Sequence, residues 1–402
     1  MNDALGLPLT CPSPDAVHAY NRAVDAYLHA WPGVGPALDD ALRAAPDFAL
    51  AHTLRALHAA VYLRRAEVGP AIALAQQHAA AASERERSHV AVLAHLVQGR
   101  AAAALEAALA HAAQWPTDAL IAAAPCGAFG LFAFSGRLDH NAARLAYLRQ
   151  LRPHFPAHHT WLLTNLGWAC IEAGALDEGV EYAERSFALR PANGNIAHVL
   201  MHGHFERRDP GAGLALIDAW LPSYPDDALL FGHLHWHAGL CEIDLGRADA
   251  AFASFTQHTL RQLDVAPPLV GMTDAASMLW RLRLLGQEAL PWPVAAAHAQ
   301  RCFGDGGNVF AEFHLAMLAA ARAEQGELAA VALRLRGIAD KGHAGAPVAL
   351  HWTAGLAALL EGDAPASRQH LSDCAAEADR LGGSHAQRMV IERTLAALPS
   401  AV

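Results

Sequence analysis

The chain has 402 residues, of which 53% are hydrophobic and 17% are charged, so it has enough apolar surface to fold and is not disordered. Its formal net charge is −10 and it carries no stripe of Lys or Arg, which predicts no binding to nucleic acid. No apolar run is long enough to span a bilayer, and the N-terminus lacks a secretory pattern. Because the six cysteines are scattered, we expect a cytoplasmic protein without membrane contact.

Helical periodicity dominates the chain. Segments rich in Ala, Leu and Arg alternate with Gly or Pro, and alternating β-branched runs are almost absent, which predicts an all-α protein. Prolines mark the ends of predicted helices at Pro46, Pro116, Pro153, Pro191 and Pro225, mostly 34 to 38 residues apart. This period is typical of stacked helical hairpins.

The first predicted hairpin covers residues 19–47, and the clearest one covers residues 160–191. The second reads TWLLTNLGWACIEAGALDEGVEYAERSFALRP and resembles a tetratricopeptide repeat. Gly167 stands where the two helices of such a repeat approach closely, Gly179 supplies a small residue, and Pro191 closes the unit.

The same frame places the next hairpin at residues 194–225 and starts another at Leu229, so the register holds over residues 160–258. Residues 259–307 contain PP, PWP and GDGG, which predicts a loop-rich insertion or a distorted repeat. Repeats resume over residues 308–402. We therefore expect one right-handed α-solenoid domain of tetratricopeptide-like hairpins across residues 1–402.

Histidine is unusually frequent, with 25 residues. His198 and His202 form a pair four apart in HVLMH, and 35 residues later His233 and His237 form a second pair in HLHWH. Residues four apart share one face of a helix, and this offset gives the two pairs equivalent positions in successive repeats. Neighbouring helix axes lie about 8–10 Å apart, a gap that two facing imidazoles can bridge. The sequence therefore predicts one metal ion bound by these four histidines in the concave groove.

Imidazole ligands favour zinc first, with copper, iron and nickel as alternatives. Four neutral ligands do not balance the charge of the ion, so a carboxylate from Asp274 or Glu206 is expected nearby. Asp274 and His314 continue the spacing of the histidine pairs, and either is a candidate for the remaining ligand or the general base. Arg281 is a candidate anion anchor, so Asp274, His314 and Arg281 are the predicted catalytic residues. His351 extends the same spacing.

Other residues near the pairs have simpler interpretations. His204 and His235 lie on the opposite helix face, so we expect them to pack or to face solvent. Trp236 is expected in the core or in a wall of the groove, and Cys241 is expected to be buried. The sequence has no G-x-S-x-G, no H-E-x-x-H, no phosphate-binding glycine loop and no dinucleotide fingerprint.

Several segments together resemble the tetratricopeptide repeat protein 38 family: RERSHVAVLAHLVQG at 85–99, HVLMHGHFERRD at 198–209, HLHWHAGLCEIDLG at 233–246, DAASMLWRLRLLG at 274–286 and FAEFHLAML at 310–318. The matching positions are His198 and His202, then His233, Trp236 and His237, then Asp274 and Arg281, and finally His314. The chain departs from the family pattern at residues 203–206 and 124–135. The resemblance implies an α-solenoid, and it supplies no established reaction.

Two functions are consistent with these patterns. The first is a metal-dependent enzyme, either a hydrolase or an oxidoreductase, that acts on a small molecule in the groove. The second is a non-catalytic scaffold that binds a peptide or partner protein there. The predicted inward positions carry His, Trp and Thr164 instead of the Lys, Arg and Asn expected for a peptide groove, which favours the enzyme. The sequence leaves open whether the protein is a monomer or a homo-oligomer.

Overall fold

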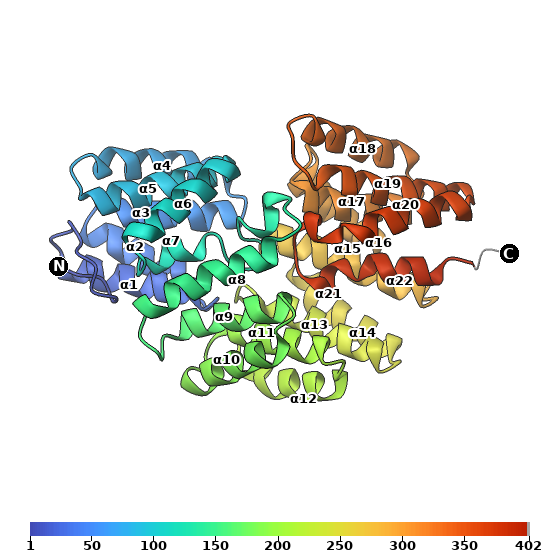
Figure 1. Cartoon of the computed structure of the whole chain (residues 1–402), viewed down its shortest axis with the longest axis horizontal. Coiled ribbons are helices and arrows are strands. Elements are labelled where there is room, and N and C mark those ends of the chain that lie inside the picture. The colour runs from blue at the N-terminus through green and yellow to red at the C-terminus, as the bar shows by residue number, and fades with distance from the viewer. Residues whose placement is uncertain (400–402) are drawn as a thin grey trace. The chain divides into compact units, whose positions relative to one another are not determined.

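The computed structural model describes residues 1–399, which fold into helices and connecting loops (Figure 1). No strand occurs in this part of the chain, apart from one isolated bridge between Asn2 and Pro8. The all-α prediction is therefore confirmed. Among the same residues, no helix combines the length and the apolar character needed to cross a membrane.

The chain divides into two compact units. Unit 1 comprises residues 1–132, 143–199 and 223–230, and unit 2 comprises residues 133–142, 200–222 and 231–402. Two helices contain a boundary between these ranges, namely α8 (His140–Leu151) and α11 (Gly194–Glu206). The single right-handed solenoid stays a prediction, and each unit is described separately.

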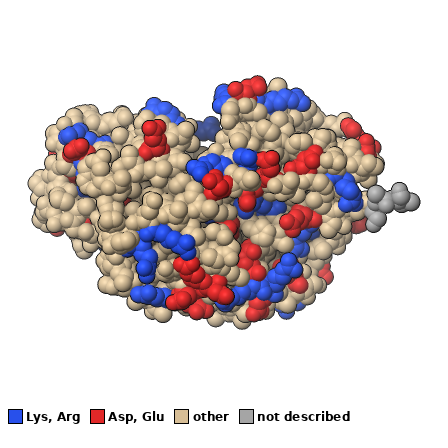
Figure 2. All heavy atoms as spheres, viewed as in Figure 1, with Lys and Arg blue, Asp and Glu red and all other residues tan. Residues whose placement is uncertain are grey.

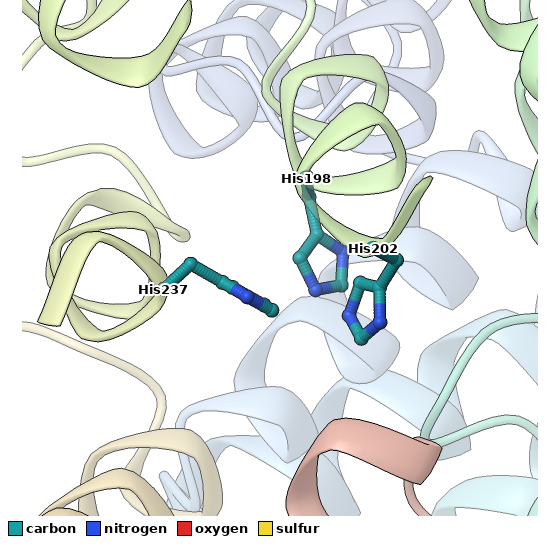
Figure 3. A group of neighbouring side chains, drawn as sticks. All are labelled: His198, His202 and His237. Carbon is teal, nitrogen blue, oxygen red and sulfur yellow. The ribbon is translucent and has the colours of Figure 1, made fainter. Parts of the chain in front are cut away.

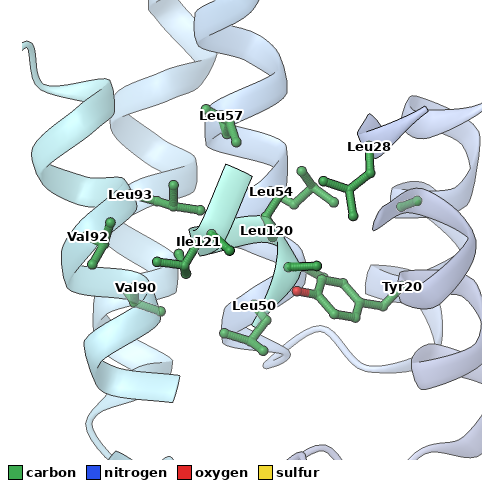
Figure 4. Packing of buried hydrophobic residues seen from close by; sticks show 14 of the residues in the cluster. Tyr20, Leu28, Leu50, Leu54, Leu57, Val90, Val92, Leu93, Leu120 and Ile121 are labelled. Carbon is green, nitrogen blue, oxygen red and sulfur yellow. The ribbon is translucent and has the colours of Figure 1, made fainter. Parts of the chain in front are cut away.

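Unit 1 consists of helical pairs. Its helices are α1 (Pro14–Leu28), α2 (Val34–Ala44), α3 (Ala49–Val61), α4 (Arg65–Ala79), α5 (Glu84–Val97), α6 (Ala101–Gln114), α7 (Ala119–Ala123), α9 (Thr160–Glu172) and α10 (Leu176–Leu189). Contacts join α1 to α2, α3 to α4, α5 to α6 and α9 to α10. The predicted hairpins at 19–47 and 160–191 are thus helical pairs. Figure 4 shows the core, where buried side chains from α1, α3, α5 and α7 meet.

Two glycines explain the close packing of α9 on α10. A Cβ atom on Gly179 would lie 2.7 Å from Ile171 Cγ1 and 2.8 Å from the carbonyl oxygen of Gly167. A Cβ atom on Gly167 would lie 3.0 Å from the carbonyl oxygen of Gly179. A side chain at either position would push the helices apart, so the predicted close approach at Gly167 is confirmed.

Unit 2 continues the paired arrangement with α12 (Pro210–Trp220), α13 (Phe231–Asp244), α14 (Ala248–Ser254), α15 (Pro268–Leu284), α16 (Trp292–Phe303), α17 (Val309–Ala321), α18 (Gln325–Ala339), α19 (Ala346–Glu361), α20 (Ala364–Ala376), α21 (His385–Arg388) and α22 (Val390–Ala397). Its core contains Trp280, Phe313 and Trp352. The two tryptophan N–H groups are satisfied, because Trp280 donates to Thr394 Oγ1 at 2.9 Å and Trp352 donates to the carbonyl oxygen of Phe313 at 3.0 Å.

The segment predicted to be irregular, residues 259–307, is mostly helical. A π-helix at Phe255–Thr259 and a 3-10 turn at Leu260–Gln262 precede α15, and α15 then packs against α16. Of the two alternatives, a distorted repeat agrees with these elements.

Charged side chains are mixed on the surface. On the face drawn in Figure 2, Lys and Arg lie interspersed with Asp and Glu. This mixture agrees with the absence of a basic stripe in the sequence, and the lack of nucleic-acid binding stays a prediction.

Candidate metal centre

The histidine pairs lie on α11 and α13, each of which begins a hairpin. His198 and His202 are one turn apart on α11, and His233 and His237 are one turn apart on α13. α12 packs closely on both helices, because a Cβ atom on Gly213 would lie 3.2 Å from both His204 Cβ and Cys241 Sγ. The repeat offset read from the sequence therefore gives both pairs equivalent places in successive hairpins.

Three of the four predicted ligands converge. One ring nitrogen from each of His198, His202 and His237 lies within 4.8 Å of the others (Figure 3). The rings of His202 and His237 are nearly perpendicular, with centroids 4.6 Å apart. Nitrogens at about 2.0–2.1 Å from a tetrahedral zinc ion are about 3.4 Å apart, so ring rotations that shorten the nitrogen separations by up to about 1.4 Å would complete the ligand set.

His233 borders this group and is held by Asp274 on α15. Its Nδ1 donates to the two carboxylate oxygens at 2.8 and 3.0 Å, and its ring lies 4.8 Å from that of His237, centroid to centroid. Since Nδ1 carries the donated proton, Nε2 is the nitrogen with a lone pair. A histidine that binds a metal ion through one ring nitrogen commonly donates its other ring N–H to a carboxylate. Asp274 thus contacts the histidines through His233 and is not one of the three converging residues.

Burial favours the neutral form of the central histidine. The pKa of His202 lies well below its ordinary value, first because the side chain is fully buried and second because His233, His385 and Arg388 are positively charged when protonated. A neutral imidazole is the form that binds a metal ion. Burial also raises the pKa of Asp274, although its hydrogen bond to His233 opposes that change.

Arg281 is held by backbone carbonyl groups. Its guanidinium donates to the carbonyl oxygens of Ser277 at 3.1 Å and Ala386 at 2.7 Å, and it lies 5.6 Å from the ring centroid of Trp236. Burial lowers its pKa to about 9. These contacts join α15 to α21 within unit 2, and the role of Arg281 as an anion anchor stays a prediction.

The other two predicted partners also lie outside the converging group. His314 Nδ1 donates to the carbonyl oxygen of Phe310 at 2.8 Å, and burial lowers the His314 pKa to about 3. Within residues 1–399, His314 Nε2 is buried without a hydrogen-bond partner. Glu206 accepts a hydrogen bond from His385 Nδ1 at 2.7 Å. The roles proposed for His314 and Glu206 stay predictions.

The neighbouring residues that were given simpler interpretations are packed against other side chains. His235 stacks on His258 with ring centroids 3.8 Å apart, and His204 lies against Gly213 of α12. Trp236 is fully buried and stacks on His233. Cys241 is buried, which raises the pKa of its thiol to about 12 and disfavours the thiolate needed for metal binding.

Two further polar groups form in the structure that the sequence did not predict. Arg85, His89, His111 and Asp118 meet in unit 1, and His351, His370 and Asp373 meet in unit 2. The sequence carried a partial signal for each: Arg85 and His89 are four apart, and His370 and Asp373 are three apart on one helix. Their partners come from other elements, so local spacing did not reveal them.

The fold and the converging histidines define an all-α protein of helical pairs with a candidate metal centre on α11 and α13. No family model matches the chain. The resemblance to the tetratricopeptide repeat protein 38 family therefore stays an expectation.

Proposed function

We propose that this protein binds one divalent transition metal ion, with zinc as the first choice, through His198, His202 and His237. The observation that carries the proposal is the convergence of one ring nitrogen from each residue within 4.8 Å. These ligands come from the first helices of two successive hairpins, and burial of His202 lowers its pKa and so favours its neutral form. The convergence and this neutral imidazole both support metal binding.

The ligand set favours a catalytic role for the ion. Structural zinc sites usually contain cysteine and have four protein ligands, whereas three protein ligands leave a position open for water or substrate. A bound ion would supply a Lewis acid that polarises an oxygen atom of a small molecule or of water. We therefore propose a metal-dependent enzyme, either a hydrolase or an oxidoreductase.

His233 and Asp274 have a supporting role in this proposal. The carboxylate fixes the proton of His233 on Nδ1 and orients the ring beside His237. With its proton held there, Nε2 of His233 carries the lone pair, and we propose that it acts either as a fourth ligand or as a base for a substrate. His198 is only partly buried, so the group borders solvent at that residue.

A double-mutant cycle tests the binding claim. His202→Ala and His237→Ala should each weaken zinc binding strongly, and the double variant should lose much less than the sum, because either change already breaks the site. Zinc binding would be measured by isothermal titration and by elemental analysis after dialysis. His204→Ala and His235→Ala are matched controls on the opposite helix faces. Both proteins should keep the full zinc content.

The cycle is best carried out in a His351→Ala, His370→Ala background, because those two residues form a separate candidate site. Independent losses in the two single variants would mean that the histidines do not share an ion. Full zinc retention in the double variant, with the helical circular dichroism unchanged, would overturn the metal site. The peptide-binding scaffold would then be the better account.

A further inference from the structure

A second group of potential ligands lies on the hairpin formed by α19 and α20. His351 comes from α19, and His370 and Asp373 come from α20, where they share one helix face. Gly355 allows the two helices to approach, because a Cβ atom there would lie 2.7 Å from Leu371 Cδ2 and 3.4 Å from His370 Cβ. Close helix packing therefore brings the three side chains together.

The distances within this group suit a tetrahedral ion. His351 Nδ1 lies 3.3 Å from His370 Nδ1 and 3.7 Å from Asp373 Oδ2. Ligand atoms at about 2.0–2.1 Å from a tetrahedral zinc ion are separated by about 3.4 Å. Two of the three edges are thus close to the required length without a change of rotamer.

A further contact orients the carboxylate. Gln369 Nε2 donates to Asp373 Oδ1 at 3.0 Å, which leaves Oδ2 as the oxygen that faces His351. Such a hydrogen bond from outside the ligand set is common around bound metals. The side chains of His351 and Asp373 are 42% and 41% exposed, so an ion can reach the group from solvent.

We propose that His351, His370 and Asp373 form a second site for a divalent transition metal ion. Its two imidazoles and one carboxylate are a common zinc ligand set, and three protein ligands leave one position open. His351 and His370 also line a cavity of about 580 Å³ whose other walls are largely apolar side chains of α18 and α19. The ion therefore stands at the wall of this cavity, where an occupant can reach its open position.

This second site differs from the centre on α11 and α13 in ways that an experiment can separate. Its ligands are partly exposed, whereas His202 and His237 are buried. Solvent competes with exposed ligands, so the second site should bind zinc more weakly and exchange it faster. Neither proposal depends on the other, since they share no residue.

Zinc titration of the full chain, stripped of metal with a chelator, tests the proposal. The wild type should bind two equivalents in two affinity classes. His351→Ala with His370→Ala should lose the weaker class and keep the tighter one, while His202→Ala with His237→Ala should do the opposite. His18→Ala, at an exposed histidine on α1, is the control and should keep both classes. Because the substituted side chains are partly exposed, the thermal transition of the His351, His370 variant should not change.

A second test replaces Asp373 by asparagine, which has nearly the same shape as aspartate. Asp373→Asn should weaken the second class at least about tenfold, because it replaces a charged ligand by a neutral amide. Cobalt(II) used as a probe should show the intense visible bands of tetrahedral coordination, reduced in the Asp373→Asn protein. If the weaker class is missing from the wild type, or persists unchanged in the His351, His370 variant, the second site does not exist. If the wild type lacks only the tighter class, that result contradicts the centre on α11 and α13 and leaves the second site standing.

Discussion

Buried histidines meet a carboxylate in both units, but the arrangements differ. In unit 1, Asp118 Oδ2 accepts from Arg85 Nη1 at 2.6 Å, His89 Nδ1 at 2.9 Å and His111 Nε2 at 3.2 Å. In unit 2, by contrast, both carboxylate oxygens of Asp274 accept from the same nitrogen, His233 Nδ1. Beside this pair, the imidazoles of His198, His202 and His237 converge on one another (Figure 3).

The direction of the ring nitrogens distinguishes a structural network from a ligand set. Burial alone would raise the pKa of Asp118, yet His89, His111 and Arg85 outweigh it, and the pKa lies well below its ordinary value. The donors of this network, Arg85, His89 and His111, all point at the negative charge of Asp118. On α11 and α13, ring nitrogens of three histidines converge on one another, and imidazole nitrogen is a ligand that divalent transition metals favour.

The largest expected effect concerns the network of unit 1. Asp118→Asn leaves the buried guanidinium of Arg85 without its counter-charge, so the free energy of unfolding should fall by about 3–5 kcal/mol. Urea unfolding followed by circular dichroism would measure the change. Asp139→Asn, which removes an exposed partner of Arg137, is the control and should leave the transition where it was. Zinc binding by the folded Asp118→Asn protein should equal that of the wild type, and a loss of zinc would contradict the separation of the two regions.

The next effect concerns metal and stability in unit 2. An ion that binds only the folded chain stabilises it by about 2.7 kcal/mol when its free concentration is about 100 times Kd. Zinc should therefore raise the thermal midpoint of the wild type, and a chelator should reverse the rise. The His202→Ala, His237→Ala protein, in the His351→Ala, His370→Ala background, should show no such shift. An equal shift in that protein would place the ion elsewhere.

A smaller effect is expected from a change at Asp274, the carboxylate that accepts a hydrogen bond from His233. Asp274→Asn removes the charged acceptor of His233 and should weaken zinc binding about 10- to 100-fold, the usual result of changing such a partner. The affinity would be measured by competition with a chromophoric chelator. Ser277→Ala, which removes the acceptor of the Trp236 indole N–H on the same helix, is the matched control. Equal weakening in both variants would indicate a general packing defect.

The smallest effect concerns pH and appears in the metal-free chain. Burial lowers the pKa of His58, His159 and His235 to about 4, whereas an unfolded histidine titrates near about 6.5. The unfolded chain therefore binds more protons in this interval. The stabilisation is fully present above about pH 6.5 and is lost gradually as the pH falls toward about 4. Urea midpoints measured with chelator at several pH values should decline across this window, and a flat profile would contradict these burial assignments.

The sequence predicted well what depends on local periodicity. Helical spacing and proline punctuation located the hairpins, and the 35-residue offset brought His202 and His237 into ring contact. Gly167 was recognised because close helix packing needs a residue without a side chain. Each of these signals lies within one hairpin or between neighbours.

Contacts between distant segments were missed for a physical reason. Arg281 donates to the carbonyl of Ala386 on α21, a contact that the sequence did not predict, because a backbone carbonyl leaves no signature in a sequence. Asp118 follows α6, but its partners Arg85 and His89 lie on α5, so their meeting depends on how these elements pack. Likewise, His351 reaches His370 only because Gly355 permits close contact between α19 and α20.

X-ray absorption at the zinc edge gives the most direct test of the proposed centre on α11 and α13. The protein would carry His351→Ala and His370→Ala, so that one site remains. The account predicts a first shell of nitrogen and oxygen at about 2.0–2.1 Å, with the outer-shell scattering of three or four imidazoles. Adding His202→Ala and His237→Ala should abolish bound zinc. A sulfur shell at about 2.3 Å, or a zinc spectrum without imidazole scattering, would contradict the central claim.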